Sequence, residues 1–110
     1  MKFKQQKVPV DCKYCTEVIG SDRYAYHIIS IDKDRRGAVI TPYNAKYVGK
    51  AYGDERYEYE DKDGNPLIDN DPKRFIRVVY RYGYWRMFNH TGPKCYFLWG
   101  VRDQYRDPSF

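Results

Sequence analysis

Short runs of aromatic and β-branched residues recur along the chain, and turn-forming residues separate them. The run at 24–31 (YAYHIISI) is followed by turn residues at 33–37 (KDRRG) and by a second run at 38–41 (AVIT). No window of eleven or more residues spaces its apolar side chains with the period of an amphipathic helix. This pattern predicts a β-hairpin within an all-β domain.

The second half of the chain continues this alternation of strand-like runs and turns. The segment 56–60 (RYEYE) alternates tyrosine with charge, and 74–82 is the longest strand candidate. Gly83 separates it from a strand at 84–88, and the mostly apolar run 95–101 (CYFLWGV) is the last. Six to seven short strands predict a small antiparallel barrel, SH3-like or related, or a sandwich.

The length of 110 residues suits one domain, so we expect residues 1–110 to form a single β domain. Residues 1–10 contain Lys2, Lys4 and Lys7, and we expect them to form a basic N-terminal arm. No apolar run approaches the ~18 residues of a membrane span. The first residues also lack the apolar stretch of a secretory signal, so we expect a cytoplasmic protein without a membrane partner.

Charge is distributed unevenly along the chain, whose formal net charge is +5. Residues 1–50 hold ten basic and five acidic side chains, whereas residues 51–72 hold two basic and eight acidic ones. Residues 73–110 return to eight basic and two acidic side chains. A basic body interrupted by one acidic segment is suited to attract a polyanion, although mixed surface charge also serves solubility.

In the predicted strand at 74–82, alternate side chains project to opposite faces. Every second residue from Ile76 to Tyr82 is expected to face the core, whereas Arg77 and Arg81 are expected to face outward without partners. The core as a whole is expected to include Ile28, Ile76, Val78, Phe97 and Trp99.

Arginine and tyrosine gather in the last third of the chain, a combination that binds single-stranded nucleic acid or a nucleotide. Guanidinium groups bind phosphates, and tyrosine rings stack on bases. The same side chains are enriched at protein interfaces, so a protein–protein interaction module, or an inhibitor of a host protein, is the alternative. The candidate ligand residues are Arg74, Arg77, Arg81, Tyr84, Arg86 and Lys94.

The spacing Cys12-Lys13-Tyr14-Cys15 places two thiols where they can share one Zn²⁺. His90 and Cys95 flank a Gly-Pro loop and complete the four ligands of a Cys₃His site. Zinc sites usually combine two complete knuckles, however, and this chain has one. We therefore expect ordinary cysteines and no cofactor, with a zinc site and a redox dithiol as the alternatives that the spacing allows.

No motif of a nucleophilic, metal-hydrolase or nucleotide-hydrolase active site occurs in the chain. The acidic residues between 54 and 63 lack the spacing of a calcium loop. Their alternation with tyrosine is typical of the solvated side of an edge strand. We therefore expect a binding protein that is not an enzyme.

Two segments of the chain have a distinctive sequence, SDRYAYHIISI at 21–31 and YRDPSF at 105–110. They resemble segments of a family of small uncharacterised β-rich proteins of phages and gut bacteria. The chain departs from that pattern before the SDR motif, where it has Cys12-Lys13-Tyr14-Cys15 in place of small glycine-rich residues. The resemblance implies a phage-type accessory or counter-defence protein. It implies no activity and no site residues.

Overall fold

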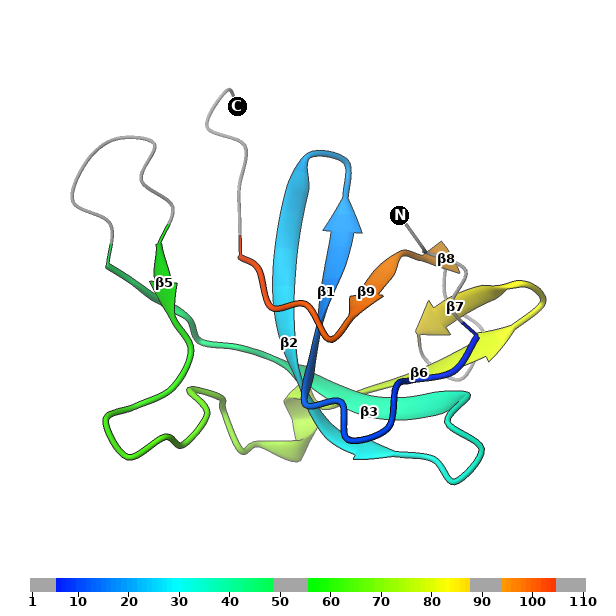
Figure 1. Cartoon of the computed structure of the whole chain (residues 1–110), viewed down its shortest axis with the longest axis horizontal. Coiled ribbons are helices and arrows are strands. Elements are labelled where there is room, and N and C mark those ends of the chain that lie inside the picture. Colours follow the sequence, from blue (N-terminus) through cyan, green and yellow to red (C-terminus); the bar gives the residue numbers. More distant parts are fainter. Residues whose placement is uncertain (1–5, 49–55, 88–93, 105–110) are drawn as a thin grey trace.

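A computed structural model gives the structure of the chain and describes residues 6–48, 56–87 and 94–104 (Figure 1). These residues contain strands and one turn of 3₁₀-helix, η1 (Pro72–Arg74), but no α-helix, so the all-β prediction is confirmed. They also contain no helix long and apolar enough to cross a bilayer. The strands are β1 (Tyr14–Ile19), β2 (Asp22–Ile31), β3 (Gly37–Pro42), β4 (Lys46–Tyr47), β5 (Tyr57–Glu58), β6 (Ile76–Arg81), β7 (Tyr84–Met87), β8 (Lys94–Cys95) and β9 (Phe97–Trp99).

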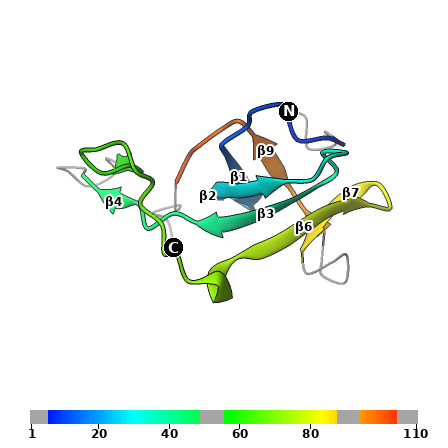
Figure 2. The ribbon, with the colours of Figure 1, turned by 90° about the horizontal axis from the view of Figure 1, so that it is seen from below.

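Seven of these strands form one antiparallel sheet in the order β8-β7-β6-β3-β2-β1-β9. Figure 2 shows β2, β3 and β6 lying side by side, with β4 beyond one end of them. The two short strands β4 and β5 pair only with each other in a separate ribbon. The described residues thus form a seven-stranded sheet and a small ribbon. They do not form a closed barrel.

One short segment joins the two ends of the sheet. Lys94 and Cys95 pair with β7, whereas Phe97–Trp99 pair with β1 at the opposite end of the strand order. Tyr96 lies between them, and its carbonyl oxygen accepts a hydrogen bond from the Val18 amide at 2.9 Å. Because consecutive residues reach both end strands, the sheet must curl around the core (Figure 1).

The core lies on the concave face of this curled sheet. Four of the five expected core residues are buried there, whereas Ile76 is partly buried against them. Two tryptophans form its centre, with the rings of Trp85 and Trp99 4.7 Å apart. The buried cluster consists of Val8, Cys15, Ile28, Ala38, Ile40, Val78, Trp85, Cys95, Phe97 and Trp99.

The described part of the expected N-terminal arm includes one core residue. Val8 is fully buried, its amide donates to the Arg35 carbonyl at 2.7 Å, and its carbonyl accepts from the Arg35 side chain. Val8 therefore belongs to the folded domain, because its apolar side chain fills the core beside the β2–β3 turn. Residues 1–5 lie outside the described part of the chain.

Candidate nucleic-acid interface

The outward face of β6, β7 and β8 gathers five of the six predicted ligand residues. Partners opposite each other in an antiparallel pair project to the same side, and every second residue along a strand does so too. Arg81 pairs with Tyr84, and Arg86 pairs with Lys94, so these side chains lie opposite the buried Trp85. The five residues on the outward face are Arg77, Arg81, Tyr84, Arg86 and Lys94.

Cations and rings alternate across this face. The Lys94 ammonium lies 4.3 Å from the centre of the Tyr84 ring. The ring centres of Tyr84 and Tyr96 lie 6.3 Å apart, and the two rings are nearly perpendicular. The Arg86 guanidinium lies 6.0 Å from the Tyr82 ring centre, and its Nε donates to the Arg81 carbonyl at 3.3 Å. We call this set the basic–aromatic face, and it consists of Arg81, Tyr82, Tyr84, Arg86, Lys94 and Tyr96.

Tyr82 corrects the sequence prediction, which placed it in the core. Its side chain is 79% exposed, and its φ of 54° is followed by a φ of 83° at Gly83. Two successive positive φ values are typical of a two-residue hairpin turn, so the chain reverses at Tyr82 and the alternation of β6 ends at Arg81. The sequence signal for this was the Tyr-Gly pair between two strand-like runs.

Arg77 also differs from its prediction, because it is not unpaired. Its Nη1 and Nη2 donate to the two oxygens of Asp32 at 2.6 and 2.5 Å. Hydrogen bonding from Arg77 is the main cause that lowers the pKa of Asp32, and the bond to Asp32 likewise raises the pKa of Arg77. Gly37 makes room for the pair, because a Cβ there would clash with Asp32 Oδ2. The charge of Arg77 is thus neutralised within the protein.

Arg74, the sixth predicted ligand residue, does not lie on the sheet. It is in η1, where the side chain of Asp71 caps the turn by accepting from the Lys73 amide. Its guanidinium is 3.9 Å from the carboxylate of Asp69. Of the six predicted ligand residues, four therefore lie on the basic–aromatic face. Arg77 is held in an internal ion pair, and Arg74 lies outside the face.

An open pocket of about 360 Å³ lies beside the basic–aromatic face, between the β2–β3 and β6–β7 turns. Hydrogen bonds fix its wall: the Tyr80 amide donates to the Arg36 carbonyl at 2.9 Å, and the Arg36 amide donates to Asp34 Oδ1 at 2.9 Å. The pattern at 33–37 predicts only a turn, and nothing in it indicates that these residues line a site. The lining residues are Asp32, Asp34, Arg36, Arg77, Val79, Tyr80, Arg81 and Tyr82.

The three cysteines do not form a metal centre with one another or with other described residues. Cys15 and Cys95 are buried in the core, whereas Cys12 is half-buried and donates to the Tyr14 carbonyl at 3.2 Å. The part of the chain that the structure describes contains no group of three His, Cys, Asp or Glu placed to hold a metal. His90 lies outside that part, so the Cys₃His site stays a prediction. Burial is the main cause that raises the pKa of all three thiols, to about 11 for Cys95.

A carboxylate is also enclosed by the core. Glu17 is only 8% exposed, and the Tyr26 hydroxyl donates to its Oε1 at 3.0 Å. The Cys95 thiol is a second hydrogen-bond partner. Burial is the main cause that raises the pKa of Glu17, because a charge is poorly solvated there.

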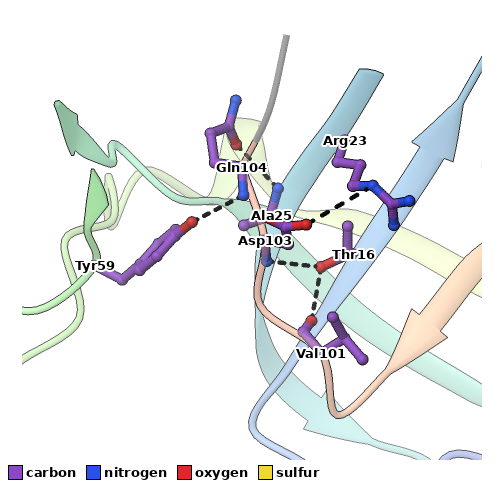
Figure 3. A network of polar contacts seen from close by, with 7 residues as sticks. All are labelled: Thr16, Arg23, Ala25, Tyr59, Val101, Asp103 and Gln104. Atoms are coloured by element: carbon purple, nitrogen blue, oxygen red, sulfur yellow. Dashed lines mark hydrogen bonds and ion pairs between the residues drawn. The ribbon is translucent and has the colours of Figure 1, made fainter. Parts of the chain in front are cut away.

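Residues 101–104 lie against β1 and β2 and are held by a network of hydrogen bonds (Figure 3). The Thr16 hydroxyl donates to the Val101 carbonyl at 2.7 Å and accepts from the Asp103 amide at 3.0 Å. Gln104 accepts from the Ala25 amide through Oε1 at 3.0 Å. This segment therefore covers Thr16 of β1 and Ala25 of β2, which are both buried.

Arg102, within this segment, is enclosed by tyrosine rings. Its guanidinium lies 4.8 Å from the ring centre of Tyr14, 5.6 Å from that of Tyr43 and 4.6 Å from that of Tyr59. It also forms an ion pair with Glu60. Arg102 belongs to the basic C-terminal third, but these contacts make its charge part of the fold and not of the basic–aromatic face.

Neither a protein-family model, nor a curated protein, nor a solved structure matches this chain. The resemblance to phage and gut-bacterial proteins therefore stays a prediction from the two sequence segments.

Proposed function

We propose that this protein binds single-stranded nucleic acid through its basic–aromatic face. The observation that supports the proposal is the alternation of cations and rings across three neighbouring strands. Lys94 lies over Tyr84, and Arg86 lies near the exposed ring of Tyr82. Proteins that bind single strands combine such cations, which bind phosphates, with rings on which unpaired bases stack.

The distribution of charge supports a polyanionic ligand. Arg81, Arg86 and Lys94 lie on the basic–aromatic face and form no ion pair within the described residues, whereas Arg74, Arg77 and Arg102 are paired with carboxylates. The described acidic residues of 56–69 lie on or near the β4–β5 ribbon, which is separate from the large sheet. Tyrosine rings stack on bases only where the bases are unpaired, so the face suits a single strand better than a duplex. The proposal involves no catalytic step.

Fluorescence anisotropy with labelled 15-nucleotide dT and rU oligomers at 50 and 200 mM salt tests this function. Binding should weaken with salt, because each neutralised phosphate releases counterions. The double variant Arg81→Ala/Lys94→Ala should make the log–log slope shallower by about 1.4, which is two contacts at ~0.7 each on single strands. Tyr84→Ala should weaken binding by about 1–3 kcal/mol.

Arg74→Ala is the matched control, because it removes one cation that lies outside the face. It should leave the affinity nearly unchanged. Absence of binding by the parent protein at 50 mM salt, or an equal loss in the Arg74→Ala control, contradicts the proposal. The first result leaves a protein partner as the alternative ligand of the same face, because exposed tyrosine is also typical of protein interfaces.

The resemblance in sequence adds a biological setting to this proposal. A phage-type accessory or counter-defence protein that binds single-stranded nucleic acid would act on replicating, transcribed or cleaved nucleic acid in the host. This setting rests on the two segments at 21–31 and 105–110 alone.

A further inference from the structure

We propose that the pocket between the β2–β3 and β6–β7 turns is a subsite that selects guanine within the bound strand. This inference rests on the proposed function. In it, Tyr82 stacks on the base, Asp34 accepts hydrogen bonds from the base edge, and Arg36 and Arg81 bind the adjoining phosphate.

The walls of the pocket are fixed by contacts inside the protein. The ion pair of Arg77 with Asp32 connects β6 to the β2–β3 turn, and Gly37 leaves space for it. The hydrogen bond from the Tyr80 amide to the Arg36 carbonyl joins the same two parts of the chain. A volume of about 360 Å³ is near the lower end of ligand pockets, so the site suits one base and not a larger ligand.

Tyr82 is an unusual residue for its position, which favours a role in binding. A bulky side chain at positive φ is uncommon, and Asn, Asp or Gly normally occupies the first position of such a turn. The residue is also 79% exposed, so its ring adds little to the buried core. An exposed ring kept in a strained turn beside a pocket provides a flat surface on which a base can stack.

Asp34 gives the pocket a preference among bases. Both oxygens of Asp32 are bonded to Arg77, whereas Asp34 uses Oδ1 for the Arg36 amide and is exposed. A carboxylate only accepts hydrogen bonds. The unpaired edge of guanine presents two adjacent donors, N1–H and the N2 amino group. Thymine and uracil present one donor between two carbonyl oxygens, which a carboxylate repels, and adenine and cytosine present one amino group.

Arg36 and Arg81 provide the positive charge for the phosphate. Both are exposed, they come from the two different turns, and neither guanidinium forms an ion pair with another residue in the described ranges. The pair of Arg77 with Asp32 is already neutral as a unit. The remaining charged groups of the pocket are therefore two guanidinium groups and one carboxylate, which match a phosphate and a base with N–H donors.

The test is competition against labelled dT₁₅ by unlabelled dT₁₅ in which one central residue is dG, dI, dA or dC. In the register that places dG in the pocket, binding should strengthen about 5-fold, the lower end of the range for a bidentate contact, because the site is exposed. The overall gain in competition is smaller than this, because the registers that place thymine in the pocket are unchanged. Inosine lacks the N2 amino group, so dI should lose most of that gain. Tyr82→Phe should retain the preference.

Asp34→Asn is the decisive variant. Asn Oδ1 can still accept from the Arg36 amide and preserve the turn, but the amide nitrogen replaces the second acceptor. This variant should bind dT₁₅ more tightly than the parent protein, because it removes the carboxylate that repels the thymine carbonyls, and it should lose the preference for dG. Asp63→Asn is the matched control, because it removes the same charge from an exposed turn elsewhere and should keep the preference.

The two proposals fail in different ways. Equal competition by all four substituted oligomers, with dT₁₅ itself bound, overturns guanine selection and leaves the proposed function standing. A preference for dG that persists in Asp34→Asn also overturns the assignment of Asp34. Absence of binding to every oligomer at low salt contradicts the proposed function itself.

Discussion

The ion pair between Arg77 and Asp32 makes a quantitative prediction about stability. Hydrogen bonds to charged groups contribute about 1.5–3 kcal/mol when buried, whereas exposed ion pairs contribute about 0–1 kcal/mol. The side chains of Arg77 and Asp32 are 38% and 32% exposed, so the pair lies between these cases. We expect Arg77→Ala to lower the free energy of unfolding by about 1–2 kcal/mol, after this discount for solvent screening.

Arg81→Ala is the comparison, because Arg81 lies on the same face of β6 without an internal partner among the described residues. It should change the free energy of unfolding by less than about 0.5 kcal/mol. Urea unfolding followed by the fluorescence of the buried Trp85 and Trp99 measures both variants. Equal effects of the two substitutions would show that the ion pair contributes nothing to folding.

The pH dependence of stability tests whether the ion pair causes the effect of Arg77→Ala. Arg77 lowers the pKa of Asp32 from its ordinary 3.8, so the folded state holds the carboxylate ionised to lower pH than the unfolded state does. The contribution is therefore fully present above pH 3.8 and is lost as the pH falls through the lower folded-state pKa. The difference between the parent protein and Arg77→Ala should shrink in that acidic range. A difference that persists unchanged there contradicts an electrostatic origin.

Gly37→Ala tests the same ion pair by displacing Asp32 instead of removing Arg77. The backbone conformation of Gly37 is accessible to any residue, so the effect of an added Cβ is steric: it displaces Asp32 from Arg77. Gly37→Ala should destabilise the protein, and most of its effect should disappear in an Arg77→Ala background. Full additivity of the two substitutions would refute this explanation of Gly37.

Two further predictions concern the core. Phe97→Ala should lower the free energy of unfolding by about 3–5 kcal/mol, because Phe97 is fully buried. Calorimetry measures this loss, and a loss under about 1 kcal/mol would contradict the buried placement of Phe97. Glu17→Gln should raise stability at pH 7 by up to about 1 kcal/mol, because the amide keeps an acceptor for the Tyr26 hydroxyl without a buried charge. The raised pKa of Glu17 means that its contribution is most favourable below its ordinary pKa of 4.5 and declines as the pH rises. The gain from Glu17→Gln should therefore vanish near pH 4, and thermal melts at both pH values check it.

Local patterns in the sequence were sufficient for much of the fold. The runs at 24–31 and 38–41 became β2 and β3, because a hairpin depends on neighbouring apolar residues and on the turn between them. Alternation also predicted correctly that Arg81 lies on the outward face. It failed at Tyr82, where the turn begins one residue before Gly83.

Contacts between distant parts of the chain were beyond such reasoning. Arg77 and Asp32 are 45 positions apart, and nothing in the spacing of either residue indicates the other. The tyrosines around Arg102 come from three separate parts of the chain. Both cases are arginines that count as positive charge in the sequence and are neutralised in the structure. A basic sequence therefore overstates the number of cations available to a ligand.

The segment that joins the ends of the sheet also has a consequence for the order of folding. Thr16 of β1 and Val101 just beyond β9 meet across 85 positions, so this closure has a high contact order and is expected to be slow. Until residues 94–99 arrive, a nascent chain leaving the ribosome presents unpaired backbone along β1 and β7 at the same time. We expect aggregation during synthesis to depend on how quickly these last strands dock, and a chaperone that shields strand edges to raise the yield of folded protein.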